Sequence, residues 1–252
     1  MKILALETSA KAVSAAIAED GKILAYGYQD TGLTHSRTLM PIVEDLTRES
    51  EFDIKNLDLI AVAAGPGSFT GIRIGVAAAK GLAFGLDKPV IGVSTLGAMA
   101  RNLSFADGLI ICAMDARRDR IYNALFQTEN GEITRLTDDR AIALESLAAE
   151  LKDYRDINHQ NQDGYNKLIN KFMVVGDGAK LCAEYLLSQG ILCHMAPANL
   201  IMQNAASVAL EAEERAREIL SASGKLPDAR DLRPVYLRPP NAIPPADVKR
   251  NV

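Results

Sequence analysis

The order of the short apolar segments constrains the fold more than any other feature of this chain. Residues 2–7, 13–18 and 22–28 are three apolar runs in succession, and Asp20-Gly21 between the last two is a strong hairpin signal. A helical pattern over 35–49, a strand over 57–64, a helix ending near 85, a strand over 89–93 and a helix to about 102 follow. Such alternation predicts parallel strands joined by right-handed crossovers. We therefore expect a mixed sheet of about five strands with helices packed on it.

A second unit with a similar order begins near residue 107. The pattern predicts strands over 109–114, 121–128 and 132–136, a helix over 144–151, a polar loop or insertion over 153–170 and a strand over 172–175. Helices over 179–189 and 198–223 complete this unit. We therefore expect an α/β protein with an N-terminal lobe over 1–106 and a C-terminal lobe over 107–224. Residues 225–252 are expected to form an extended tail that packs back on the first lobe.

Composition excludes several classes of protein. A net charge of −4, 5% aromatic residues and no tryptophan argue against a basic or base-stacking surface for nucleic acid. The three cysteines form no C-x-x-C pair and the three histidines lie far apart, so no disulfide framework or local metal motif is expected. The N-terminus does not have the pattern of a signal peptide, and no uninterrupted apolar run approaches about 18 residues. We expect a cytoplasmic protein without a membrane segment, metal or cofactor.

Two loops have the composition of a ligand site. A carboxylate and two hydroxyls end the first predicted strand, and a glycine-rich turn joins the strand over 57–64 to the next helix. Glycine lets a backbone approach an anion closely, and a helix N-terminus attracts negative charge. The spacing G-x-G-x-x-x-G fits neither a dinucleotide fingerprint nor a P-loop, so a tight structural turn is an equal alternative. The candidate ligand loop consists of Glu7, Thr8, Ser9, Gly65, Gly67 and Ser68.

The helix over 72–86 is apolar on nearly every side. Arg73 and Lys80 are its only charged residues, whereas a surface helix usually has a broad polar face. Small residues at 71, 75, 78, 81 and 85 would permit another helix to approach closely. Either the helix over 35–49 covers this surface, or a second protein does.

Six segments of this chain resemble the TsaB (YeaZ) family of bacterial tRNA threonylcarbamoyladenosine biosynthesis proteins. In the order expected of that family, they are ALETS, THSRTLMPIVEDL, AAGPGSFTGIRIGVAAAKGLA, PVIGVSTL, MDARRDRIY and PVYLR. The resemblance is dense over 1–122, sparse over 123–233, and returns at 234–238. It implies a two-lobed, actin-like fold of the sugar-kinase and heat-shock-chaperone ATPase superfamily. This implication agrees with the two lobes predicted from the order of segments.

The resemblance also implies a non-catalytic role. In TsaD, the paralogue that transfers threonylcarbamoyl to the adenosine next to the anticodon, the segment matching IGVSTLGAM carries two metal-binding histidines. Thr95 and Met99 stand at those positions here, and neither can replace such a ligand. The chain is therefore expected to bind a TsaD-like catalytic subunit through its first lobe, as a heterodimer that a TsaE-like ATPase also engages. It would meet tRNA only through that complex, and would form a homodimer when alone.

In the family, two helices of the first lobe pack with their TsaD counterparts as a bundle. The resemblance assigns this role to the helices over 35–49 and 72–86 of this sequence. The candidate partner contacts are His35, Leu39, Val43, Ile72, Val76 and Lys80.

Two other function classes remain open. A nucleotide-binding kinase of the same superfamily would need an acidic catalytic residue, for which Glu7 is a weak substitute, and Gly176-Asp177-Gly178 is short for an adenosine loop. A stand-alone RNA-binding module is disfavoured by the net charge and the few aromatic residues.

Overall fold

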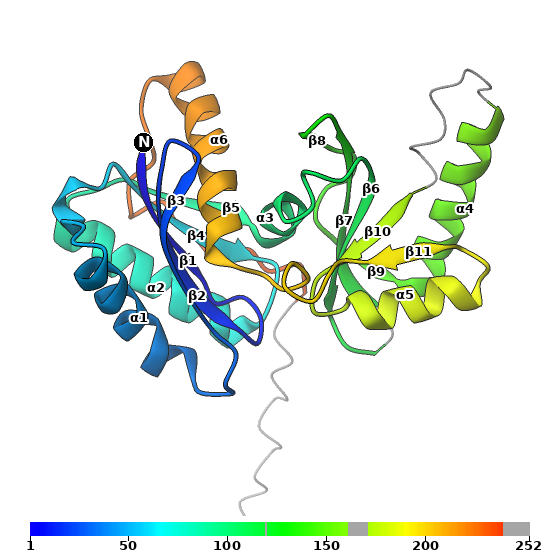
Figure 1. Cartoon of the computed structure of the whole chain (residues 1–252), viewed down its shortest axis with the longest axis horizontal. Coiled ribbons are helices and arrows are strands. Elements are labelled where there is room, and N and C mark those ends of the chain that lie inside the picture. The colour runs from blue at the N-terminus through cyan, green and yellow to red at the C-terminus, as the bar shows by residue number, and fades with distance from the viewer. Residues whose placement is uncertain (119, 161–170, 239–252) are drawn as a thin grey trace, which may run out of the picture.

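The chain folds into two lobes, each built on a mixed β-sheet (Figure 1). The computed structural model describes residues 1–118, 120–160 and 171–238, without the side chains of 156–160. The first sheet has five strands in the order β3-β2-β1-β4-β5, as the order of apolar segments predicts. The second sheet has six strands in the order β11-β10-β6-β7-β8, and β9 also pairs with β7.

Strand β1 lies at the centre of the first sheet. Its strands β1 and β2 pair antiparallel, as do β2 and β3, whereas β1–β4 and β4–β5 are parallel pairs. The central strands are almost fully buried, which matches their continuous apolar runs. The strands are β1 (Lys2–Glu7), β2 (Val13–Glu19), β3 (Lys22–Gln29), β4 (Leu59–Gly65) and β5 (Val90–Ser94).

Helices cover both faces of the first sheet (Figure 1). Helices α1 (His35–Glu49) and α2 (Phe69–Leu86) pack on one face, and α6 (Ala205–Ser223) packs on the other. The short helix α3 (Thr95–Arg101) contacts α6 and strands of both sheets. The lobe predicted over 107–224 therefore includes a helix, α6, that lies on the first lobe. Its buried alanines allow it to approach the alanine-rich face of β1, β2 and β4.

The helix predicted over 198–223 begins seven residues later than expected, at Ala205. Asn204 precedes it, and its side chain accepts a hydrogen bond from the backbone N–H of Ser207 at 2.9 Å. An asparagine at this position ends the preceding irregular segment and satisfies a free N–H of the first turn.

Two helices cover one face of the second sheet. Phe172, Val174 and Leu186 belong to the core between this sheet and helices α4 and α5. Helix α4 continues well beyond the predicted end at 151, so 153–160 is helical rather than a loop; residues 161–170 lie outside the described part. Strands β9 and β11 were not predicted. The elements are β6 (Gly108–Asp115), β7 (Arg120–Glu129), β8 (Glu132–Arg135), β9 (Arg140–Ala143), α4 (Leu144–Gln160), β10 (Phe172–Val175), α5 (Ala179–Ser188) and β11 (Cys193–Met195).

The C-terminal segment 225–238 runs back along the first lobe, while 239–252 lies outside the described residues. Pro227 accepts a hydrogen bond from the backbone of Val90 at 3.3 Å, and Val235 donates one to Ala64 at 2.7 Å. Leu232 is only 7% exposed and joins the core beneath α2. This segment thus forms part of the first lobe's structure.

By length and composition alone, α2 could cross a membrane; it is the one such helix in the described part of the chain. Arg73 and Lys80 interrupt its apolar sequence, which is why no continuous apolar run was found. In this structure the helix lies on the first sheet and buries Ile72, Val76 and Ala79 against it.

Candidate functional site

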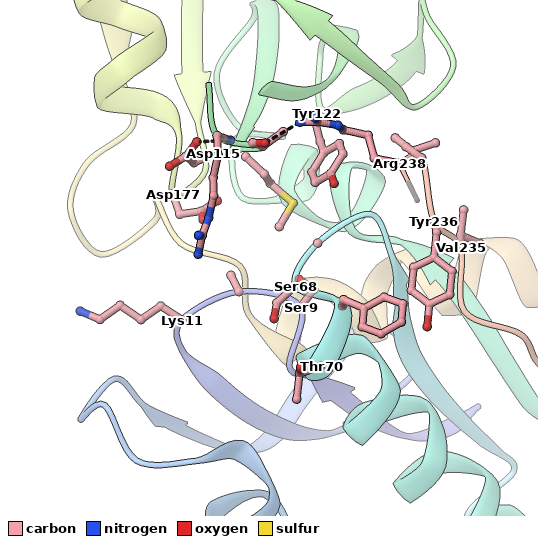
Figure 2. Close-up of a pocket in the computed structure, with 17 residues that line it drawn as sticks. Ser9, Lys11, Ser68, Thr70, Asp115, Tyr122, Asp177, Val235, Tyr236 and Arg238 are labelled. Carbon is pink, nitrogen blue, oxygen red and sulfur yellow. Dashed lines mark hydrogen bonds between the residues drawn. The ribbon is translucent and has the colours of Figure 1, made fainter. Parts of the chain in front are cut away.

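A cleft of about 520 Å³ lies between the two lobes (Figure 2). The first lobe contributes two turns, residues 9–11 and 67–70, and the second lobe contributes residues 114–117 together with Tyr122 and Asp177. The C-terminal segment 235–238 forms a further wall, with Tyr236 and Arg238 facing the cleft from the side opposite Lys11. Three separate parts of the chain therefore build this cleft.

The candidate ligand loop is brought together, but its parts pack on one another. The backbone N–H of Ser68 donates to the Ser9 carbonyl at 2.6 Å, and the Thr8 hydroxyl donates to the Gly71 carbonyl at 2.7 Å. A Cβ on Gly67 would lie 2.4 Å from the Ser9 carbonyl oxygen, and one on Gly71 only 2.0 Å from that of Thr8. These glycines permit close packing between two turns, as the structural alternative predicted. Ligand binding by these residues stays a prediction.

Gly65 and Gly92 make room for the C-terminal segment. Gly65 has a φ of +131°, and a Cβ there would lie 2.2 Å from the carbonyl oxygen of Val235. A Cβ on Gly92 would lie 2.8 Å from a methyl group of Leu232. The sequence motif around Gly65 carries no signal of this role, because its contact is with a residue far away in the sequence.

Two carboxyl groups lie near the cleft: Asp177 lines it, and Glu7 is hydrogen-bonded to the lining residue Ser9. Glu7 is 1% exposed; one carboxylate oxygen accepts a hydrogen bond from the Ser9 backbone, and the other has no partner among the described residues. Burial raises the pKa of Glu7 to about 7, and the charge of Asp177 in the other lobe adds to this shift. Burial also raises the pKa of Asp177, which accepts a hydrogen bond from Gln203 at 2.9 Å. The lining itself mixes the acidic Asp115 and Asp177 with the basic Lys11, Arg117 and Arg238.

The glycine turn of the second lobe also serves packing. A Cβ on Gly176 would lie 2.1 Å from the Ala113 carbonyl oxygen, and one on Gly178 would lie 2.8 Å from the Asp115 nitrogen. Both glycines therefore allow the β10–α5 turn to press against the end of β6. This packing role gives no support to an adenosine-binding role for the Gly176-Asp177-Gly178 turn.

Four of the six predicted partner contacts lie in the protein's own core. Leu39, Val43, Ile72 and Val76 are at most 5% exposed and pack between α1, α2 and the sheet. They cannot reach a partner while the lobe is folded, so these predicted contacts are wrong. Helical spacing identified the apolar stripe of each helix, but the sheet, rather than a partner, covers that stripe.

The other two predicted contacts hold parts of the chain together. His35 is half-buried, and its Nε2 lies 3.2 Å from the Ala12 carbonyl oxygen. The Lys80 ammonium donates to the Leu232 carbonyl at 3.3 Å and so anchors the C-terminal segment to α2.

The opposite side of α2 is exposed in the part of the chain that the structure describes. Arg73, Ala77, Gly81 and Phe84, which we name the α2 outer stripe, are exposed and follow one another at spacings of four, four and three residues. This spacing places them along one side of the helix. Phe84 is 88% exposed, the largest value among the exposed large apolar side chains that the structure describes. The helix over 35–49 therefore leaves this side of α2 exposed, and its cover by a second protein stays a prediction.

Comparison with known proteins connects this geometry to a family. The family model described as "TsaD: tRNA N6-adenosine threonylcarbamoyltransferase" matches residues 29–244. A curated relative from Bacillus subtilis, tRNA threonylcarbamoyladenosine biosynthesis protein TsaB, is 37% identical over 61% of this chain and 67% of its own length. The Escherichia coli TsaB is 39% identical over 52% of this chain and 58% of its own length.

The chain belongs to the TsaB family, within the wider group matched by the TsaD model. Its members are named as biosynthesis proteins of tRNA threonylcarbamoyladenosine. The crystal structure of YeaZ from Pseudomonas aeruginosa covers 94% of this chain and 99% of its own, with a TM-score of 0.71 and 28% identity. This likeness confirms the predicted family and the α/β fold with two mixed sheets.

The two positions singled out from the resemblance to TsaD are buried. Thr95 and Met99 lie on α3 and are at most 1% exposed. The Thr95 hydroxyl has no hydrogen-bond partner among the described residues. The same part of the chain contains no group of three His, Cys, Asp or Glu side chains that could hold a metal ion.

Sequence reasoning did not predict three features of this surface. They are the exposure of Phe84, the packing of the C-terminal segment against Gly65, and the contact of Tyr236 with α2. Tyr236 and Phe69 have ring centroids 4.9 Å apart. Of the small residues singled out along α2, only Gly81 lies on the outer stripe, whereas Gly71 and Gly75 are buried against Thr8. The PVYLR segment was quoted only as a family motif, and nothing local in it indicates its neighbours.

Proposed function

We propose that this chain is a non-catalytic subunit in the transfer of threonylcarbamoyl to the adenosine next to the anticodon of tRNA. It binds and supports a TsaD-like catalytic subunit, with which it forms a heterodimer through the outer surfaces of α1 and α2. The observation that carries the proposal is the α2 outer stripe, where Phe84 is 88% exposed beside Ala77 and Gly81.

The shape and composition of this stripe suit a helix of another protein. Alanine and glycine carry little or no side chain, so a second helix can approach to about 8–10 Å between axes. Exposed large apolar side chains in the centre of such a surface are typical of interface hot regions. A stable interface buries at least about 1,000 Å² in total, which requires α1 as well as α2.

The proposal of a non-catalytic role rests on the α3 positions. Threonine and methionine are poor ligands for a hard or borderline cation, so Thr95 and Met99 do not recreate the histidine pair of TsaD. In this proposal the partner supplies the catalytic metal, and this chain needs no cofactor. A TsaE-like ATPase and tRNA are engaged through the complex, in the cytoplasm.

The test is reconstitution from purified components. A TsaD-like enzyme, a TsaE-like ATPase, tRNA and threonylcarbamoyl-adenylate are combined with and without this chain, and modified adenosine is measured. We expect product to depend on the chain. Equal product in its absence would refute the proposal.

A matched pair of variants tests the surface. Phe84→Asp places a charge in the α2 outer stripe and should weaken binding to the TsaD-like subunit at least about tenfold. Phe105→Asp makes the same change at a side chain that is 70% exposed in the turn after α3, and should leave binding unchanged. Both variants should keep the thermal stability of the parent, because both side chains are exposed. Equal binding by the two variants would exclude the α2 outer stripe as the interface.

A further inference from the structure

Arg73 is held in a fixed position at one end of the α2 outer stripe. Its guanidinium carbon lies 3.8 Å from the centroid of the Phe69 ring and 5.8 Å from that of Tyr236. Its Nε donates a hydrogen bond to the Tyr236 hydroxyl at 2.8 Å. No carboxylate pairs with Arg73 in the part of the chain that the structure describes, and the side chain is exposed. Its terminal nitrogens are therefore available to a group outside the chain.

The C-terminal segment is what positions Tyr236. The preceding residue, Val235, donates its backbone N–H to Ala64 at 2.7 Å, and its carbonyl occupies the space that Gly65 leaves free. Further back, Leu232 is buried and its carbonyl accepts a hydrogen bond from Lys80. The segment is thus bound to α2 at two points, Lys80 and Arg73, which lie seven residues apart on the same helix.

An arginine held between aromatic rings suits one kind of ligand. The planar guanidinium binds a carboxylate or phosphate through two parallel hydrogen bonds, and this geometry is not available to lysine. Fixing the side chain in advance lowers the entropy lost on binding. Arginine and tyrosine are also the residues most enriched among interface hot spots.

The surroundings favour a carboxylate of a protein over a phosphate of RNA. The neighbours of Arg73 along the stripe are Ala77, Gly81 and Phe84, which are apolar. The two arginines of the adjoining segment 232–238 donate to carbonyls of this chain, Arg233 to Leu232 and Arg238 to Ala116. The chain as a whole has a net charge of −4. A surface for a phosphate backbone combines several basic side chains, whereas one arginine at the edge of an apolar patch is typical of a protein interface.

We propose that Arg73, held by Phe69 and Tyr236, binds a carboxylate of the protein that docks on the α2 outer stripe. The C-terminal segment 232–238 is then part of the docking surface, although it is more than 140 residues away from α2 in the sequence. This inference rests on the proposed function, because it assigns a specific contact to the same partner.

The experiment measures the affinity of the full chain for the TsaD-like subunit by calorimetry. Arg73→Lys keeps the charge but cannot form two parallel hydrogen bonds to a carboxylate, and should weaken binding about tenfold. Tyr236→Phe keeps the ring and removes the hydroxyl that accepts from Arg73, and should weaken binding several-fold. The controls are Arg215→Lys on α6 and Tyr28→Phe on β3, two exposed positions that should bind as the parent does. Thermal melting verifies that each variant is folded.

The outcomes separate this inference from the proposed function. If Phe84→Asp weakens binding but Arg73→Lys does not, the carboxylate contact is refuted and the proposed partner surface stands. If neither variant weakens binding, both fall. An unchanged affinity of Tyr236→Phe would refute the role of the C-terminal segment. If Arg73→Lys binds the partner normally but the complex retains less tRNA, Arg73 contacts phosphate and the inference is overturned.

Discussion

At the scale of single residues, the buried carboxyl group of Glu7 makes the stability of the fold depend on pH. Its pKa is raised from 4.5 to about 7 by burial, so the folded protein keeps a proton that the unfolded chain releases above pH 4.5. Its contribution to stability is therefore greatest below 4.5 and is lost as the pH rises to about 7. The loss amounts to about 3 kcal/mol.

Glu7→Gln should remove this dependence, because the amide cannot ionise. We expect urea unfolding at a series of pH values to show a smaller fall in the free energy of unfolding between pH 4.5 and 7 than in the parent. The same pH slope in both proteins would show that Glu7 is not the titrating group.

The single residues also show where sequence-based prediction of the site ends. The glycines and hydroxyls of the candidate loop were correctly located at the ends of strands β1 and β4. Their neighbours could not be predicted, because the contact of Gly65 with Val235 and the electrostatic effect of Asp177 on Glu7 join positions far apart in the sequence. Glycine spacing alone cannot distinguish a space filled by a ligand from one filled by another part of the chain.

At the scale of elements, long periodic segments were predicted well and short ones were not. Helix α1 has the predicted bounds, His35–Glu49, because its apolar residues recur at helical spacing. It continues through Pro41. Strand β11 has three residues and β9 has four, which are too few to establish an alternating pattern. Because α2 is apolar on most sides, its sequence did not show which side faces the sheet.

The packing of the C-terminal segment against Gly65 gives a prediction at this scale. Gly65→Ala places a Cβ against the Val235 carbonyl at a φ of +131°, and should destabilise the fold by about 1–3 kcal/mol. Gly81→Ala is the control: the site has open space in the middle of α2, so alanine should stabilise the helix by about 0.5–1 kcal/mol. Urea unfolding of the isolated chain measures both.

Limited proteolysis gives a second measure of the packing of this segment against Gly65. Displacement of the segment by Gly65→Ala should speed tryptic cleavage after Arg230, which lies within it, while Gly81→Ala should not. Cleavage at the parental rate in Gly65→Ala would show that the segment does not depend on this glycine.

At the scale of the whole molecule, the lobes are joined by two chain segments that meet at Asn102. Its amide nitrogen donates to the carbonyls of Leu200 at 2.7 Å and Met202 at 3.0 Å, and its oxygen accepts from Asn204 at 2.9 Å. The C-terminal segment adds a third connection, since Arg238 donates to the Ala116 carbonyl at 2.8 Å. The α2 outer stripe reaches this third connection, because its Arg73 donates a hydrogen bond to Tyr236 of the same segment.

The uncovered stripe has a consequence for the chain when its partner is absent. A second copy offers the same apolar surface around Phe84, and a two-fold arrangement would let each α2 cover the other. We therefore expect sedimentation velocity to show a monomer–dimer equilibrium that shifts to dimer with concentration. Phe84→Asp should shift it back to monomer, whereas Phe105→Asp should not. Because the TsaD-like subunit would occupy the same stripe, adding it should replace the homodimer by the heterodimer. A parent chain that stays monomeric at the highest concentrations would show that the stripe is too small or too polar to drive self-association.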